Sequence, residues 1–289
     1  MGDFFFGPEP IVWLQDLLEP IGPDPFRALS LIGDIWGLLF ALGLVIWVWG
    51  RSTLYALVPL LAIEAVSYLL INHLAGIPRP TGEAVVKYET LSISAFPSGH
   101  TYLTVIVWGF LYRQGRIGLG VAVAMVAGVV LGRLFLGVHH LGDVVGGVVL
   151  GSAVVWAYGR AWPKLEDWLT RRSYVFYVIG ACALVGATVL MLPFIGGNPR
   201  WYAAAGMIAA AGVALPVEYR WIRWRGSREP ARARALCVAG GLLGILVAFY
   251  AQHGLPDAAR VAIFGITAAA TLWVFLVAPG TAARVRHER

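Results

Sequence analysis

The chain has 289 residues, of which 59% are hydrophobic and only 13% are charged. Soluble domains carry roughly 25% charged residues, because a hydrated surface requires them. The composition therefore excludes a soluble globular protein and predicts an all-α polytopic membrane protein. We interpret the net charge of +6 as an indication of membrane orientation and not of nucleic-acid binding, because basic residues of membrane proteins gather in cytoplasmic loops. We expect membrane lipids as partners and no nucleic acid.

In chain order, the first predicted element is a short interfacial helix. Residues 10–19 group apolar side chains with only Gln15, Asp16 and Glu19. This segment is too short to cross a bilayer, which requires about 20 residues. Residues 1–25 are therefore predicted to form an amphipathic region that lies in the membrane interface.

About nine hydrophobic segments follow, each near the length of a transmembrane helix. The first five form a predicted core over residues 26–173, and the last four form an accessory helical region over residues 174–289. The predicted spans cover residues 26–50, 53–74, 98–113, 117–135, 139–160, 174–193, 201–219, 234–252 and 258–278.

Glycines spaced by four within these segments predict where helices pack closely. The clearest pairs are Gly128 with Gly132 and Gly147 with Gly151. Small residues at this spacing let two helix backbones approach each other, so we interpret these glycines as packing residues.

The basic residues predict which side of the membrane each loop faces. Nine spans place the two termini on opposite sides, and most of the 22 lysine and arginine residues fall on the side of the C-terminus. The cluster from Arg220 to Arg234 is the largest of these groups. The positive-inside rule then predicts a multi-pass protein of the cell membrane, with a cytoplasmic C-terminus and with the N-terminus outside.

The loop after the second span, on the predicted outer face, ends in Pro97-Ser98-Gly99-His100. Pro97 keeps the preceding chain out of a helix, and Ser98 is a favoured N-cap for the next span. The first backbone N–H groups of that helix can hold an anion, to which Gly99 allows close approach, with His100 within reach. Arg79, earlier in the same loop, adds a fork of donors that fits a tetrahedral oxyanion.

A second polar group, on the same predicted face, follows the fourth span and consists of Arg133, His139 and Asp143. His139 and Asp143 are four residues apart, so they share one face of a helix. The carboxylate can accept from one ring nitrogen, fix the tautomer and leave the other nitrogen as a nucleophile. Together the two loops predict a phosphoryl-transfer site that needs no metal and no cofactor. His73 and His140 are interpreted as interfacial polar residues.

These blocks, in this order and at these intervals, resemble the signature of the type 2 phosphatidic acid phosphatase superfamily over about residues 72–143. The resemblance implies that His139 is the nucleophile that forms a phosphohistidine and that Asp143 orients it. It also implies that His100 protonates the leaving oxygen and later activates water.

The resemblance further implies which groups hold the phosphoryl oxygens in a reaction that depends on positioning and electrostatics. These groups are Arg79, Arg133 and the amides of Ser98 and Gly99. The family's first block begins with a lysine seven residues before the arginine, and this place is occupied by Asn72. Lys87 can supply a charge from the same loop, and its surroundings resemble the sphingosine-phosphate phosphatase branch.

The sequence leaves several functions open. The leading hypothesis is a phosphatase that hydrolyses phosphate monoesters or diphosphates of lipids at the outer face. The layout also resembles the glucose-6-phosphatase branch, which implies a sugar-phosphate phosphatase, and a phosphotransferase would use the same residues. Asp34 and Glu64 lie within predicted spans, where a charged side chain is costly. Such residues can line a polar route through the membrane, so a transporter or flippase is the non-enzyme alternative. For both residues we favour a hydrogen bond to a neighbouring helix. The natural substrate and the oligomeric state, a homo-oligomer included, stay open.

Overall fold

The computed structural model describes residues 2–82, 84–89, 94–191, 199–256 and 258–285. Within these residues every element of secondary structure is a helix and none is a strand, so the all-α prediction is confirmed. The chain forms two compact units. The N-terminal unit comprises residues 1–37 and 56–165, and the C-terminal unit comprises residues 38–55 and 166–289. Residues 38–55 thus group with the C-terminal helices, which chain order alone does not indicate.

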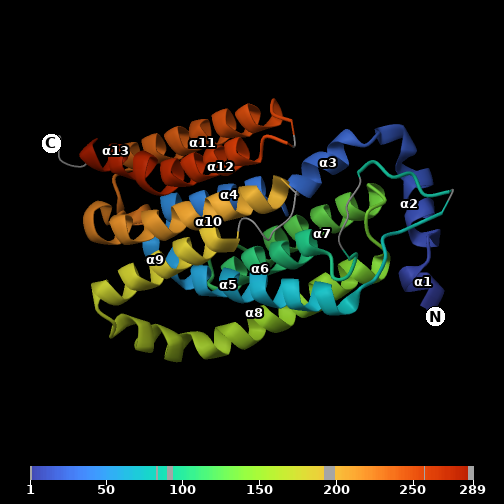
Figure 1. The fold of residues 1–289 in the computed structure, drawn as a ribbon, viewed down its shortest axis with the longest axis horizontal. Coiled ribbons are helices and arrows are strands. Elements are labelled where there is room, and N and C mark those ends of the chain that lie inside the picture. The colour runs from blue at the N-terminus through green and yellow to red at the C-terminus, as the bar shows by residue number, and fades with distance from the viewer. Residues whose placement is uncertain (1, 83, 90–93, 192–198, 257, 286–289) are drawn as a thin grey trace. The chain divides into compact units, whose positions relative to one another are not determined.

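Among the described residues, the N-terminal unit contains five complete helices and most of two others (Figure 1). They are α1 (Gly2–Phe6), α2 (Glu9–Leu18), α3 (Asp24–Leu31), α5 (Arg51–Ala75, from residue 56 on), α6 (Gly99–Arg113), α7 (Leu119–Phe135) and α8 (Leu141–Thr170, up to residue 165).

Close helix packing in this unit depends on glycine, as the sequence predicts. A Cβ atom at Gly132 of α7 would lie 2.7 Å from the carbonyl oxygen of Phe26 in α3. Cβ atoms at Gly147 and Gly151 of α8 would lie 3.0 Å from the carbonyl oxygen of Ser98 and 2.9 Å from Val105 of α6. The backbones of α3 and α7, and of α8 and α6, therefore contact each other where any larger residue would clash.

The first predicted span, over residues 26–50, is broken in the structure. After α3, residues 32–34 leave the helical path before α4 (Ile35–Leu44) and a π-helical turn (Val45–Trp49) continue it. The Asp34 carboxylate accepts a hydrogen bond from the amide of Ile35 and so caps the start of the new helix. This bond lies within its own segment, and the bond expected from Asp34 to a neighbouring helix stays a prediction.

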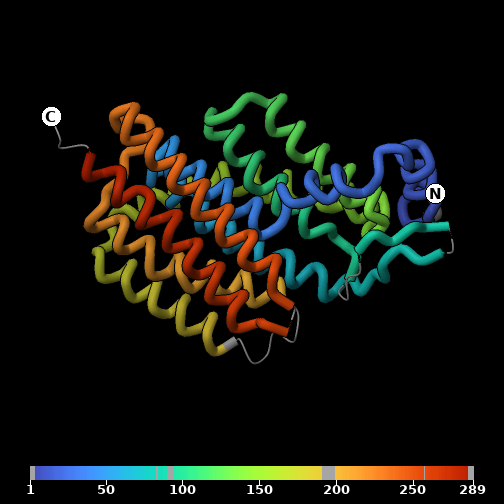
Figure 2. The backbone as a smooth tube through the Cα atoms, turned by 90° about the horizontal axis from the view of Figure 1, so that it is seen from above, coloured from blue at the N-terminus to red at the C-terminus, as the bar shows by residue number. Residues whose placement is uncertain are grey.

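The C-terminal unit contains the remaining helices, and α11 and α12 run side by side within it (Figure 2). Two tryptophans tie distant segments together: Trp47 Nε1 donates to the Val274 carbonyl oxygen at 3.0 Å, and Trp224 Nε1 donates to the Trp47 carbonyl oxygen at 3.2 Å. Its complete helices after residue 166 are α9 (Tyr174–Met191), α10 (Pro199–Val217), α11 (Ala231–His253), α12 (Arg260–Leu272) and α13 (Ala278–Arg284), with π-helical turns at Glu218–Ile222 and Trp273–Val277.

Among the described residues, five helices are long and apolar enough to cross a membrane, or six if the α3–α4 pair counts as one broken span. The five are Arg51–Ala75, Leu141–Thr170, Pro199–Arg228, Ala231–His253 and Arg260–Arg284. The helices α7 and α9 are apolar but shorter, and α6 has 15 residues. An integral membrane protein is thus supported, whereas the count of nine crossings and the interfacial position of α2 stay predictions.

Candidate active site

His139 lies in the connection between α7 and α8, outside the helical spans, and its side chain is only 2% exposed. Arg79 Nη1 lies 2.9 Å from His139 Nε2, 3.2 Å from Nδ1 and 2.7 Å from the carbonyl oxygen of Val138. Asp143 Oδ2 lies 3.6 Å from Nδ1, which is too far for a direct hydrogen bond. The structure therefore brings three predicted site residues from two loops into direct contact.

The neighbours of His139 assign its tautomer and its charge. A guanidinium only donates, so the shorter contact makes His139 Nε2 the acceptor and places the ring proton on Nδ1, towards Asp143. Burial lowers the pKa of His139 to about 3; the Asp143 carboxylate opposes this shift, whereas the Arg79 and Arg133 charges add to it. The imidazole is therefore neutral near neutral pH, with its lone pair on the nitrogen that faces Arg79.

Asp143, in the first turn of α8, is completely buried and links both histidines to α6. Its Oδ2 accepts from the backbone amide of His140 at 2.7 Å and lies 3.2 Å from the His140 ring. Its carbonyl oxygen accepts from the Ser98 amide at 3.0 Å. His140 is itself buried, so its interpretation as an interfacial residue was wrong: it helps to hold the carboxylate that faces His139.

The loop that carries Arg79 is held by a residue that replaces the family's lysine. Asn72 Nδ2 donates to the carbonyl oxygens of Ser94 and Phe96, each at 3.0 Å. Arg79 Nη2 donates to the same Ser94 oxygen at 3.2 Å, and the Ile77 amide donates to Ser94 Oγ at 3.1 Å. Asn72 thus fixes the loop between Arg79 and α6, and Ser94 is a supporting residue that the sequence did not indicate.

Ser98 precedes the first residue of α6, as its N-cap role predicts, but its polar groups are engaged within the protein. The side chain is fully buried, and its hydroxyl accepts from Thr101 Oγ1 at 3.1 Å. Because its amide donates to Asp143, this amide braces α6 against α8. The Ser98 amide is therefore engaged within the protein, and the phosphate contact expected from the Gly99 amide stays a prediction.

Gly99 and His100 form the first turn of α6. A Cβ atom at Gly99 would lie 2.9 Å from the Tyr68 ring, so a larger residue would push against α5. His100 is partly exposed, and Gly33 lies against it, because a Cβ at residue 33 would approach the His100 Cβ to 2.9 Å. The break between α3 and α4 thus packs on the helix start that carries His100.

Arg133, in the last turn of α7, is fully buried. Its Nη1 donates to Ser30 Oγ at 2.7 Å and to Glu89 Oε2 at 3.2 Å. The Glu89 side chain is 24% exposed, so this ion pair connects the buried guanidinium to the surface of the loop. Sequence reasoning found Arg133 but neither Ser30 nor Glu89, since both contacts join segments far apart in the chain.

Lys87 is exposed, and Gln15 of α2 holds the segment that carries it. Gln15 Nε2 donates to the carbonyl oxygens of Val86 and Phe135, each at 2.7 Å, and the Val86 amide donates to Gln15 Oε1 at 3.1 Å. Gln15 is therefore a structural residue of the site that its amphipathic context concealed. Within the described part of the chain, no group of three or more His, Cys, Asp and Glu side chains could hold a metal ion.

Residues 52–167 match the model of the PAP2 superfamily. The chain is 31% identical over 91 residues to lipid phosphate phosphatase delta of Arabidopsis thaliana, which covers 27% of this chain and 22% of that protein. It is 37% identical over 87 residues to decaprenylphosphoryl-5-phosphoribose phosphatase of Mycobacterium tuberculosis, which covers 30% of this chain and 48% of that protein. The matches thus span about half or less of these curated relatives, and no solved structure matches.

Proposed function

We propose that the protein is a membrane phosphatase that hydrolyses phosphate monoesters or diphosphates of lipids without a metal. The match of residues 52–167 to the PAP2 superfamily model supports this proposal. The contact of Arg79 and Asp143 with the two ring nitrogens of His139 carries this proposal. It supplies a neutral nucleophile, a fixed tautomer and a phosphate-binding guanidinium in one place. Both relatives are named as phosphatases, one of them for lipid phosphates, and this supports the same chemistry.

In the first half-reaction, His139 Nε2 attacks phosphorus and the bond between phosphorus and the ester oxygen breaks. Arg79 already lies 2.9 Å from Nε2, so a phosphoryl oxygen bound to this guanidinium would bring phosphorus next to the nucleophile. His100 protonates the leaving oxygen. Asp143 stabilises the positive charge that develops on the ring, with the Nδ1 proton held towards it.

In the second half-reaction, water attacks the phosphohistidine and the bond between phosphorus and nitrogen breaks. His100 accepts the proton of this water, and inorganic phosphate leaves. Arg133 and the Gly99 amide stabilise the phosphoryl oxygens in both transition states, and Lys87 adds positive charge from the loop. Phosphoryl transfer requires mainly such positioning and electrostatic stabilisation, which this set of residues provides.

We place this site at the outer face of the cell membrane. The basic residues on the side of the C-terminus support a cytoplasmic C-terminus, and the positive-inside rule then places the N-terminus and the loops of the site outside. A phosphorylated lipid would reach the site from the same leaflet.

The test uses the purified full chain in detergent, with phosphate release from phosphatidic acid, sphingoid-base phosphates, polyprenyl phosphates and glucose 6-phosphate measured in EDTA. We expect turnover of lipid phosphates, and we expect His139→Ala to lower the rate by at least about 10² to 10⁴-fold. The matched control is His73→Ala, because His73 is exposed at the end of α5. Full activity of His139→Ala, or a strict requirement for added Mg²⁺, would contradict the proposal.

A phosphoenzyme assay tests the intermediate directly. Wild-type protein quenched during turnover of a ³²P-labelled lipid phosphate should carry label that is stable to base and labile to acid, as expected for a phosphoramidate. His139→Ala should carry none. Label that survives acid, or label on the His139→Ala variant, would assign the covalent step to another residue.

A further inference from the structure

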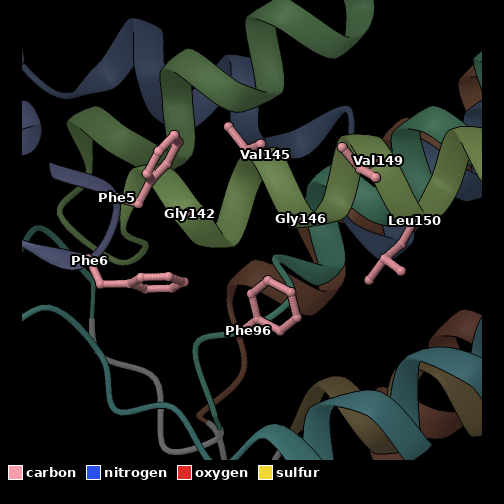
Figure 3. A pocket seen from close by; sticks show the side chains of 8 residues that line it. All are labelled: Phe5, Phe6, Phe96, Gly142, Val145, Gly146, Val149 and Leu150. Carbon is pink, nitrogen blue, oxygen red and sulfur yellow. The ribbon is translucent and has the colours of Figure 1, made fainter. Parts of the chain in front are cut away.

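An apolar groove of about 550 Å³ lies in the N-terminal unit beside the site (Figure 3). Its walls are Phe5 and Phe6 of α1, Phe96 of the loop before α6, and one face of α8 from Gly142 to Leu150. All of the lining residues are apolar. Its size falls within the range of about 300–1,000 Å³ that small-molecule sites occupy.

Two glycines of α8 seat the aromatic walls of the groove. A Cβ atom at Gly142 would lie 2.6 Å from the Phe6 ring, and one at Gly146 would overlap the Phe96 ring. The two glycines are four residues apart, so both rings rest on one face of the helix. Val145 and Val149 of α8 leave 40% and 60% of their surface exposed within the groove.

One end of the groove adjoins the catalytic residues. Gly142 lies between His140 and Asp143 in the chain, and the Phe6 and His140 rings are 6.0 Å apart. Phe96 lies two residues before Ser98. From Gly142 to Leu150 the groove follows α8 for about 12 Å, at about 1.5 Å per residue.

We infer that this groove binds the hydrocarbon chain of the substrate, with its first carbon atoms beside Gly142 and its phosphate on Arg79 and His139. The inference rests on the proposed function and adds a binding site to it. A charged site that continues into a wholly apolar groove is complementary to a molecule with a phosphate at one end and a hydrocarbon chain at the other. The short α1 helix, which contributes Phe5 and Phe6, thereby becomes part of the substrate site.

The groove acts by positioning the substrate. A lipid chain in a bilayer or micelle is already in apolar surroundings, so its transfer into the groove gains little free energy from the hydrophobic effect. A chain held along α8 instead fixes the direction from which the phosphate meets His139, and orientation of this kind affects turnover. Blocking the groove should therefore lower kcat for long-chain substrates more than it raises KM.

The test fills the groove with Val149→Trp and compares dodecyl phosphate with 4-nitrophenyl phosphate, which has no chain. We expect kcat for dodecyl phosphate to fall by about tenfold or more, since small misplacements of a substrate have large effects on rate. Hydrolysis of 4-nitrophenyl phosphate should be unchanged. The matched control is Val123→Trp on α7, which is exposed outside the groove and should change neither rate. Equal losses for both substrates, or no loss for either, would overturn the inference.

A binding experiment separates this inference from the proposed function. Dodecyl phosphate with a photoreactive diazirine near the end of its chain is cross-linked to His139→Ala, which is expected to bind without turnover. Label at residues 145–150 supports the groove, even if the wild-type protein hydrolyses no substrate and the proposed function fails. Label at other residues overturns the inference. A change in oligomer size of the Val149→Trp variant would also overturn it, because it would show that a second copy of the chain occupies the groove.

Discussion

Among the described residues, each unit of the molecule buries one carboxylate completely, and the two carboxylates differ in what surrounds them. Asp143 of the N-terminal unit contacts two imidazoles, His139 at 3.6 Å and His140 at 3.2 Å. Glu218 of the C-terminal unit accepts from the Tyr55 hydroxyl and the Trp224 amide, each at 2.8 Å. A carboxylate between titratable rings can direct protons, whereas one held by an amide and a hydroxyl fixes the end of a helix.

The comparison shows that burial of a charged group does not by itself indicate a functional site. Both carboxylates accept hydrogen bonds, although Asp143 Oδ1 has no hydrogen-bond partner among the described residues. Only Asp143 belongs to a set in which an acid, a base and a guanidinium contact one another. Function is therefore inferred from which groups face each other, and this distinction can be tested in three ways.

The largest difference should appear when each carboxylate is made neutral. Asp143→Asn can no longer stabilise an imidazolium at His139 and can support the wrong tautomer, so we expect kcat to fall by about 10² to 10⁴-fold. Glu218→Gln should leave turnover within about twofold, because it touches no group of the site. Steady-state rates with one lipid phosphate measure both variants. Comparable losses in the two would show that the carboxylates act alike.

A smaller effect is expected from Arg79→Lys. Lysine keeps the charge but cannot reach both His139 and the Ser94 carbonyl oxygen as the guanidinium does. The loss of one charge-assisted hydrogen bond, worth roughly 1.5–3 kcal/mol, predicts a decrease in kcat/KM of about 10- to 150-fold. Arg51→Lys, which alters a guanidinium of the C-terminal unit, is the control. Wild-type kinetics for Arg79→Lys would remove the fork geometry from the mechanism.

The smallest effect is the pH dependence of stability that His139 confers on the N-terminal unit. The pKa of His139 is about 3 in the folded protein, below the value of about 6.5 in the unfolded chain. The unfolded chain therefore binds the extra proton first, so this stability is fully present above pH 6.5 and is lost as the pH falls towards 3. At pH 5 the loss is about 2 kcal/mol.

Thermal unfolding midpoints of the wild type and of His139→Asn, measured at pH 8 and pH 5, test this dependence. The variant should lose less stability between the two pH values than the wild type. His253→Asn is the control, because His253 is exposed in the C-terminal unit. Equal pH dependence of the wild type and His139→Asn would show that His139 binds its proton similarly in the folded and unfolded states.

The sequence predicted those parts of the site that depend on local spacing. The helix predicted from residue 98 begins at Gly99, and His139 and Asp143 lie 3.6 Å apart. The helix face predicted to carry both residues was wrong, because α8 begins at Leu141 and His139 precedes it. The supporting contacts could not be predicted in this way. Gln15 reaches the Phe135 carbonyl oxygen across 120 positions of the chain, and no period or motif indicates such a contact.

The fold was predicted to a similar extent, since hydrophobic runs locate helices but do not show where a run is interrupted. Residues 26–50 are continuously apolar apart from a few positions, yet the helix stops at residues 32–34. The signal for this break was Gly33-Asp34, a residue that permits close packing followed by one that caps a helix. Its cause is tertiary, because Gly33 packs against His100.

The two glycine faces of α8 have a consequence for the design of altered specificity. Gly147 and Gly151 support α6, whereas Gly142 and Gly146 carry the rings of the groove. A library that varies Val145 and Val149 would therefore leave the scaffold untouched while it changes the length of chain that fits. The residues of α8 that line the groove differ from those that support α6. The groove residues can therefore be varied to change substrate selectivity without compensating mutations in the residues that stabilise the fold.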